Sequence, residues 1–117
     1  MANFTTATPK TMNRTIRRGV RWLLERNLYV DDVEFPVAGY SFRQEFRASS
    51  SPESQLLEVA SIEIPDDESN AVQASLTADE TLAMVAGRHA RWHQFFIRGE
   101  RTDYEWVLLE EGWIRVI

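Results

Sequence analysis

Cysteine is absent from this chain of 117 residues, and lysine occurs only once, at Lys10. The lack of cysteine excludes a disulfide framework, thiolate-bound zinc and thiol catalysis. No apolar run reaches the roughly 18 to 20 residues that a membrane-spanning helix needs. Residues 1–10 lack the apolar core of a signal peptide. The sequence therefore predicts a protein that is made in the cytoplasm, is not exported by a cleaved signal and has no membrane partner.

Positive charge is also in short supply. The 13 Lys and Arg residues stand against 18 Asp and Glu, which gives a net charge of −5. Nucleic-acid binding depends on the neutralisation of phosphates, so this acidic chain is a poor candidate for it. One stretch is nevertheless basic, since it contains Arg14, Arg17, Arg18, Arg21 and Arg26. The guanidinium fork suits carboxylates, and we expect these arginines to pair with carboxylates on neighbouring strands or across a subunit interface.

The chain does contain a series of short β-compatible runs. Apolar and polar residues alternate from Tyr40 to Arg47, as in a strand with one buried face. Further strands are expected over residues 20–30, 56–64, 71–76, 88–97, 103–110 and 113–117. Turn signals separate these runs roughly every 8 to 12 residues, which favours an antiparallel sandwich or barrel over alternating strands and helices. The sequence thus predicts an all-β domain of about seven strands.

One short helix and an N-terminal arm complete the expected layout. Thr77 and Glu80 have the spacing of a capping box, and Gly87 is a suitable place for the chain to break after a helix. A helix is therefore predicted at about residues 78–84. In residues 1–12, Phe4 is the only large apolar anchor before Met12, and we expect an extended arm that is either disordered or docked on a neighbour. Residues 13–117 then form a single domain.

The strand expected over residues 88–97 contains both histidines. On a strand, His89 and His93 share a face but lie about 13 Å apart at 3.3 Å per residue, too far for one zinc ion bound at about 2 Å. The acidic turn 66–70 lacks the spacing of a calcium loop. No metal site or other cofactor is therefore expected. Of the two alternating faces of this strand, the better candidate for the core is formed by Ala90, Trp92, Gln94 and Phe96.

The tryptophans raise a different possibility. Flat aromatic platforms bind sugars, and the residues that would form one are Trp22, Trp92, Trp106 and Trp113. Such a platform requires at least two rings that are coplanar and exposed. The competing interpretation is that a small two-sheet core needs large side chains, each of which buries about 150–250 Å². Because no nucleophile, carboxylate pair or phosphate loop stands out, no catalytic residue and no small-molecule substrate are expected.

Five short motifs follow one another in an order that resembles a known family. They are Ile-Arg-Arg-Gly at 16–19, Val-x-Gly-Tyr-x-Phe-Arg at 37–43, Ser-Leu-Thr-Ala-Asp-Glu-Thr at 75–81, Ala-Gly-Arg at 86–88 and Leu-Leu-Glu-x-Gly-x-Ile-x-Val at 108–116. The resemblance covers roughly residues 13–117. The chain resembles the small immunoglobulin-like β-sandwich domains of tailed-phage virion proteins, among them the LtfC-like domains of phages that infect actinobacteria. The N-terminal domains of baseplate proteins are similar.

This resemblance implies an immunoglobulin-like sandwich and a non-enzymatic structural role in the virion. The chain would be a capsid accessory protein, a head–tail connector or a tail or baseplate component, made in the host cytoplasm. Its partners would be other virion proteins, in several symmetric copies. The residues expected to contact them are Phe4, Arg14, Arg17, Arg18 and Arg21. Two alternatives remain open: a carbohydrate- or host-receptor-binding module that uses the four tryptophans, and a small phage inhibitor of a host enzyme.

Overall fold

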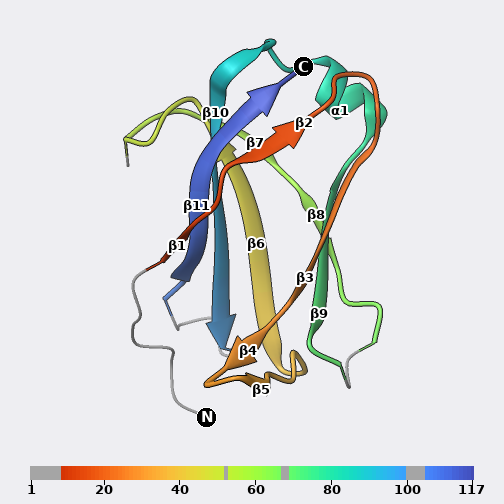
Figure 1. Ribbon diagram of the computed structural model, residues 1–117, viewed down its shortest axis with the longest axis vertical. Coiled ribbons are helices and arrows are strands. Elements are labelled where there is room, and N and C mark those ends of the chain that lie inside the picture. The colour runs from red at the N-terminus through yellow and green to blue at the C-terminus, as the bar shows by residue number, and fades with distance from the viewer. Residues whose placement is uncertain (1–8, 52, 67–68, 100–104) are drawn as a thin grey trace.

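The computed structural model describes residues 9–51, 53–66, 69–99 and 105–117, which form two facing β-sheets (Figure 1). The strands along the chain are β1 (Lys10–Thr11), β2 (Arg14–Ile16), β3 (Trp22–Asn27), β4 (Tyr29–Val30), β5 (Val33–Glu34), β6 (Tyr40–Arg47), β7 (Leu56–Val59), β8 (Ser61–Glu63), β9 (Ala71–Leu76), β10 (Gly87–Gly99) and β11 (Val107–Val116). A short helix, α1 (Ala78–Leu82), follows β9. The expected all-β sandwich with one short helix is confirmed for the described residues.

The strand order is that of an immunoglobulin-like domain. In such sandwiches the second, fifth and fourth strands form one sheet, and the third, sixth and seventh form the other. The small sheet here has the order β3-β9-β8, and the large sheet has the order β1-β11-β10-β6-β7, with β2 also paired to β11. Both β1 and β2 run parallel to β11. The first strands therefore pair with the last strand of the domain and not with β3.

Two clusters of buried side chains fill the space between the sheets. One cluster contains Phe46 and Met84 and lies towards α1. The other contains Phe42 and Phe95, whose rings stack with their centres 5.8 Å apart. Burial of each such side chain contributes about 1.5–3 kcal/mol to folding. The two clusters therefore hold the sheets together along most of their length.

Local sequence signals predicted two elements closely. β6 occupies the predicted range 40–47, and the alternating residues Phe42, Gln44 and Phe46 are buried. Helix α1 begins with the predicted capping box: the Glu80 N–H donates to the Thr77 hydroxyl at 3.1 Å, and the Thr77 N–H donates to the Glu80 carboxylate at 2.8 Å. No helix in the described ranges is long and apolar enough to cross a membrane.

The single strand predicted over residues 56–64 is in fact two strands in different sheets. β7 pairs with β6 in the large sheet, whereas β8 pairs with β9 in the small sheet. Ala60 lies at the crossing, and its N–H donates to the Gln44 carbonyl at 2.9 Å. Leu28 similarly separates β3 from β4. The described chain therefore has eleven strand segments instead of about seven, since a continuous apolar run does not reveal where a chain changes sheet.

The predicted core face of β10 was wrong from Trp92 onwards, although Ala90 does pack against the core. His93 and Phe95 are fully buried, whereas Trp92 lies half-buried on the outer face of the large sheet. The imidazole of His93 is satisfied inside the core, because its Nε2–H donates to the Met12 carbonyl at 2.6 Å and its Nδ1 lies 3.4 Å from the Gln44 amide nitrogen. A polar residue can be buried where it has hydrogen-bond partners. The apolar pattern alone therefore predicted the wrong face of this strand to be buried.

The first described residues lie directly on the last strand. The Met12 N–H donates to the Glu111 carbonyl, and the Trp113 N–H donates to the Asn13 side-chain oxygen, both at 2.9 Å. A Cβ atom at Gly112 would lie 2.2 Å from the Met12 carbonyl oxygen, so this close approach requires glycine. β11 continues through Gly112, where two separate strands were expected.

The expected N-terminal arm is described only at its end. Residues 1–8, which include Phe4, lie outside the described residues. Lys10 and Thr11 form β1 and pair with Glu110 and Glu111. The part of the arm that the structure describes is therefore a strand of the large sheet.

Candidate functional site

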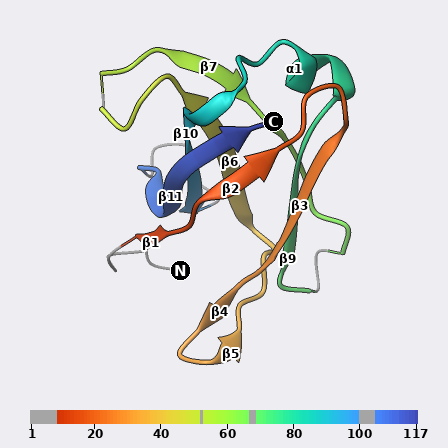
Figure 2. The same cartoon turned by 45° about the horizontal axis from the view of Figure 1, so that its top comes forward.

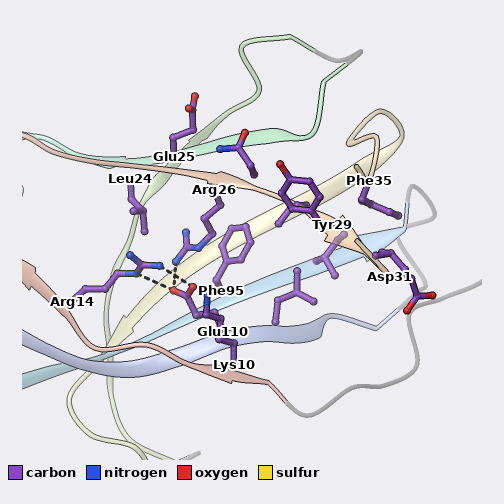
Figure 3. Close-up of a pocket in the computed structure, with 15 residues that line it drawn as sticks. Lys10, Arg14, Leu24, Glu25, Arg26, Tyr29, Asp31, Phe35, Phe95 and Glu110 are labelled. Atoms are coloured by element: carbon purple, nitrogen blue, oxygen red, sulfur yellow. Dashed lines mark hydrogen bonds and ion pairs between the residues drawn. The ribbon is translucent and has the colours of Figure 1, made fainter. Parts of the chain in front are cut away.

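A groove of about 700 Å³ lies on the side of the sandwich where β3 faces β1, β2 and β11 (Figure 3). Lys10 and Arg14 line one wall, and Leu24, Glu25 and Arg26 line the other. The apolar part of its lining consists of Leu24, Leu28, Val30, Phe35, Phe95, Ile97 and Leu109. The site is thus mostly apolar inside, with charged side chains on both walls.

The groove follows from the pairing of the first strands. Because β1 and β2 pair with β11, β3 has no neighbouring strand on one side in the described part of the chain. The Leu28 N–H donates to the Asn70 carbonyl at 2.9 Å, in register with the β3–β9 ladder. Residues in an antiparallel strand alternate in the direction of their backbone hydrogen bonds. The N–H and C=O groups of Leu23, Glu25 and Asn27 therefore point away from β9, and we call these groups the open edge of β3.

Arg14, Arg26 and Glu110, which we call the inner triad, connect three strands across the groove. The Arg14 Nε and Nη2 atoms donate to the two carboxylate oxygens of Glu110 at 3.0 and 2.8 Å, and the Arg26 Nη2 donates at 2.7 Å (Figure 3). The Arg26 guanidinium also lies over the Phe95 ring, 4.0 Å from its centre. Such charge-assisted and cation–π contacts link β3 of the small sheet to β2, β10 and β11 of the large sheet.

The charged groups of this cluster have fixed protonation states near neutral pH. Burial alone would raise the pKa of Glu110, but the hydrogen bonds from Arg14 and Arg26 lower it to about 2. Burial lowers the pKa of Arg26, against the opposing effect of Glu110. Burial also lowers the pKa of His93, whose Nδ1 lies 3.8 Å from Glu110. His93 is therefore neutral at pH 7, and Glu110 is ionised.

Positive charge and hydrogen-bond donors are in excess in the inner triad. Two guanidinium groups share a single carboxylate, and the Nε and Nη1 atoms of Arg26 have no hydrogen-bond partner among the described residues. Lys10, on the same wall as Arg14, adds a further positive charge. This end of the groove is therefore suited to an acceptor group that carries negative charge.

The same cluster is poorly suited to proton transfer. A carboxylate with a pKa of about 2 is neither a useful base nor a useful acid at neutral pH. The His93 ring is enclosed by Met12 and Gln44. In the described ranges, no group of three His, Cys, Asp or Glu residues is placed to hold a metal ion. The inner triad therefore does not supply a proton-transfer group near neutral pH.

Of the residues predicted to contact a partner, Arg14 lies in the groove. Arg17, Arg18 and Arg21 are exposed outside the groove lining, and the Arg18 Nη2 donates to the Leu82 carbonyl of α1 at 3.2 Å. Phe4 lies outside the described residues. Of these four arginines, Arg14 alone therefore lies in the groove lining.

Arg26 is the site residue that the predicted contacts left out. The expectation that arginines of this stretch pair with carboxylates on other strands holds for Arg14 and Arg26, since both bind Glu110. The signal that distinguishes Arg26 is its position, because it has the same parity along the strand as Trp22 and Leu24, which point towards the core. A charged residue on the inward face of a strand requires a partner.

The four tryptophans pack edge-on against other rings or beneath a guanidinium in the contacts that the described structure shows. The rings of Trp92 and Trp113 meet at 80°, and Trp22 packs against Phe46 at 81°. The Arg98 guanidinium covers Trp106, 4.2 Å from a ring centre. All four side chains are half-buried. The condition set above for a sugar-binding surface is therefore not met by these ring pairs.

Comparisons with known proteins add little to this description. No protein-family model and no curated protein matches the chain. A similar solved chain comes from photo-crosslinking analyses of multimeric cell-adhesive interactions of VGSC beta subunits. It is 12% identical, the match covers 97% of this chain and 98% of that chain, and the TM-score is 0.42. A similarity of this degree says nothing about function.

Proposed function

We propose that this chain is a structural component of a phage particle that acts by docking on other virion proteins and has no catalytic activity of its own. The phage assignment is supported by the five ordered sequence motifs. The docking role is supported by the geometry, which offers binding surfaces and an ionised, tightly paired carboxylate in place of a proton-transfer group. The position of the domain in the particle stays open among capsid, connector, tail and baseplate.

The hairpin of β4 and β5 is the observation on which this proposal depends most. Tyr29, Val30 and Val33 expose 58%, 49% and 67% of their surfaces, and Val30 pairs directly with Val33. The hairpin belongs to neither sheet and projects from the body of the sandwich (Figure 2). Contiguous exposed apolar side chains on a small domain are typical of interaction sites. We therefore expect another virion protein to cover this hairpin.

Quantitative mass spectrometry of purified particles, from the phage that encodes the chain, tests the virion role. We expect several copies of the chain per particle, since closed symmetric assemblies use repeated contacts. A chain that is abundant in the infected lysate but absent from particles would overturn the proposal and would favour the inhibitor alternative.

A single substitution in the hairpin tests the docking surface. Val33→Ser alters a valine that is 67% exposed and lies outside the groove lining, so we expect an unchanged melting temperature and at least a tenfold loss of incorporation into particles. The matched control is Val85→Ser, which alters a valine that is 65% exposed after α1. Equal incorporation of the two variants would exclude the hairpin as the docking surface.

A further inference from the structure

We propose that the open edge of β3 accepts an extended segment of a partner protein as an added strand, and that this segment carries an acidic side chain between apolar ones. The inference rests on the proposed docking function, because it names the way in which the domain recognises another protein. It assigns a role to the groove and to the inner triad, which the exposed hairpin alone does not use.

The backbone of β3 is suited to strand addition. Leu23, Glu25 and Asn27 each present an N–H and a C=O group away from β9, and all three residues are exposed. Among the described residues, no strand pairs with these groups, and open edges of this kind recruit further strands. A six-residue strand spans about 20 Å. The open edge can therefore pair with a segment of five or six residues in an antiparallel or parallel ladder.

The groove lies where side chains of an added strand would be placed. Alternate side chains of a strand point to opposite faces of its sheet, so every second side chain of the added segment would face the groove. There it would meet apolar surface from Leu24, Phe95 and Leu109 within a space of about 700 Å³. Apolar residues at alternating positions of the segment would fill this space.

Charge selects an acidic residue for one of these positions. Lys10, Arg14 and Arg26 place three positive charges at the end of the groove that holds the Glu110 carboxylate, and the Arg14 side chain is 20% exposed. Of the other two carboxylates in the lining, that of Asp31 lies at the far end of the groove (Figure 3). On the opposite wall, the Glu25 carboxylate already accepts a hydrogen bond from the Gln73 amide at 3.1 Å. A carboxylate of the partner would compensate the excess positive charge, whereas a lysine in the same place would be repelled.

A second copy of the chain is the competing occupant of the open edge. A symmetric antiparallel pair centred on the middle of β3 would place Glu25 opposite the Glu25 of its partner copy. Like charges in directly opposite positions destabilise a strand pair. The charge of the open edge therefore favours a different protein over self-pairing.

Panning a displayed library of random linear peptides of about twelve residues against the wild-type protein tests the inference. We expect the recovered peptides to share an acidic residue flanked by alternating apolar residues. In synthetic versions of these peptides, replacement of the acidic residue by lysine should weaken binding at least tenfold. Failure to recover any binding peptide, or equal binding of the lysine versions, would overturn the proposal.

Two substitutions at one position test whether the backbone of β3 makes the contact. Glu25→Pro removes an N–H that points away from β9, and proline is tolerated at such edge positions, so we expect a folded protein that binds the peptides at least tenfold more weakly. Glu25→Ala removes the same carboxylate but keeps this N–H, so it should bind the peptides at least tenfold more tightly than Glu25→Pro. Unchanged binding by Glu25→Pro would overturn the proposal, as would a concentration-dependent dimer of the wild type that this substitution abolishes.

If Glu25→Pro does not fold, hydrogen exchange on the wild-type protein still tests whether the backbone of β3 pairs with the peptide. Bound peptide should slow amide exchange at Leu23, Glu25 and Asn27 at least tenfold, and an absence of slowing at these amides would contradict strand addition.

The result of the peptide-binding experiments does not depend on the virion role. Peptide binding by a chain that is absent from particles would refute the proposed function alone, and a virion component without peptide binding would refute this inference alone.

Discussion

The inner triad has a counterpart on the outer face of the large sheet, where Arg43, Glu45 and Arg47 form an outer triad of the same composition. The outer triad lies within β6, and its members are two positions apart. In the inner triad, the arginines lie 96 and 84 positions from the glutamate. One arrangement fixes side chains along a single strand, whereas the other connects strands of both sheets.

Burial makes the two triads unequal in energy. The two central carboxylates are almost equally buried, since the side chains of Glu110 and Glu45 expose 7% and 9% of their surfaces. The triads differ in their arginines: the Arg26 side chain is 8% exposed, whereas those of Arg43 and Arg47 are 36% and 23% exposed. Water can hydrate the outer arginines if their partner is lost, but it cannot reach Arg26 in the same way. The comparison suggests that the inner triad is indispensable to the fold and that the outer triad is a minor contributor.

Removal of the central carboxylate from the inner triad should have the largest effect. Glu110→Gln keeps the size of the side chain but leaves two positive charges against a neutral amide. Loss of one partner from a buried ion pair costs about 3–5 kcal/mol, so we expect the free energy of unfolding to fall by that amount. Urea denaturation at pH 7 measures it, and a loss below about 1 kcal/mol would contradict the importance of the triad.

Acid should remove most of the difference between wild type and Glu110→Gln. The folded-state pKa of Glu110, about 2, lies below its ordinary value of 4.5. Its ionised form therefore stabilises the fold fully above pH 4.5, and this contribution is lost as the pH falls from 4.5 to 2. The lost stabilisation amounts to about 3 kcal/mol. Urea titrations of both proteins across this range measure the gap, and a gap that does not change with pH would contradict the ionised pairing.

The matching change in the outer triad should have the smallest effect. Glu45 itself is buried, but Glu45→Gln leaves two arginines that water can hydrate, since the Arg43 and Arg47 side chains are 36% and 23% exposed. Ion pairs that solvent can reach contribute about 0–1 kcal/mol. We expect a loss of about 1 kcal/mol or less in the same urea experiment. A loss equal to that of Glu110→Gln would show that burial does not distinguish the two triads.

The parts of the fold that sequence predicted well depend on neighbours along the chain. The alternation in β6 and the capping box of α1 are both visible within eight residues or fewer. Gly112 can be read from the sequence, but the reason why glycine is required there cannot. The atom that a Cβ at this position would meet belongs to Met12, which is distant in the sequence. Local patterns identify elements, while contacts between distant segments decide their exact extent and environment.

The candidate site could not be predicted for the same reason. Three polar side chains that point inward, those of Arg26, His93 and Glu110, break the hydrophobic alternation on three different strands. Their hydrogen-bond partners all lie on other segments: Glu110 binds Arg14 and Arg26, and His93 contacts Met12 and Gln44. The sequence indicated that the arginines would find carboxylates, but it could not indicate that two of them would share Glu110 beside an open groove.

The parallel pairing of β2 with β11 also determines when the domain becomes complete. Closure of a long loop costs more entropy than closure of a short one, and contacts between distant parts of a chain slow folding. The outer triad and the capped helix can form from residues that are close in the sequence. The groove wall that contains Arg14 can form only when β2 pairs with β11. A partner strand would therefore bind only after the domain has folded completely.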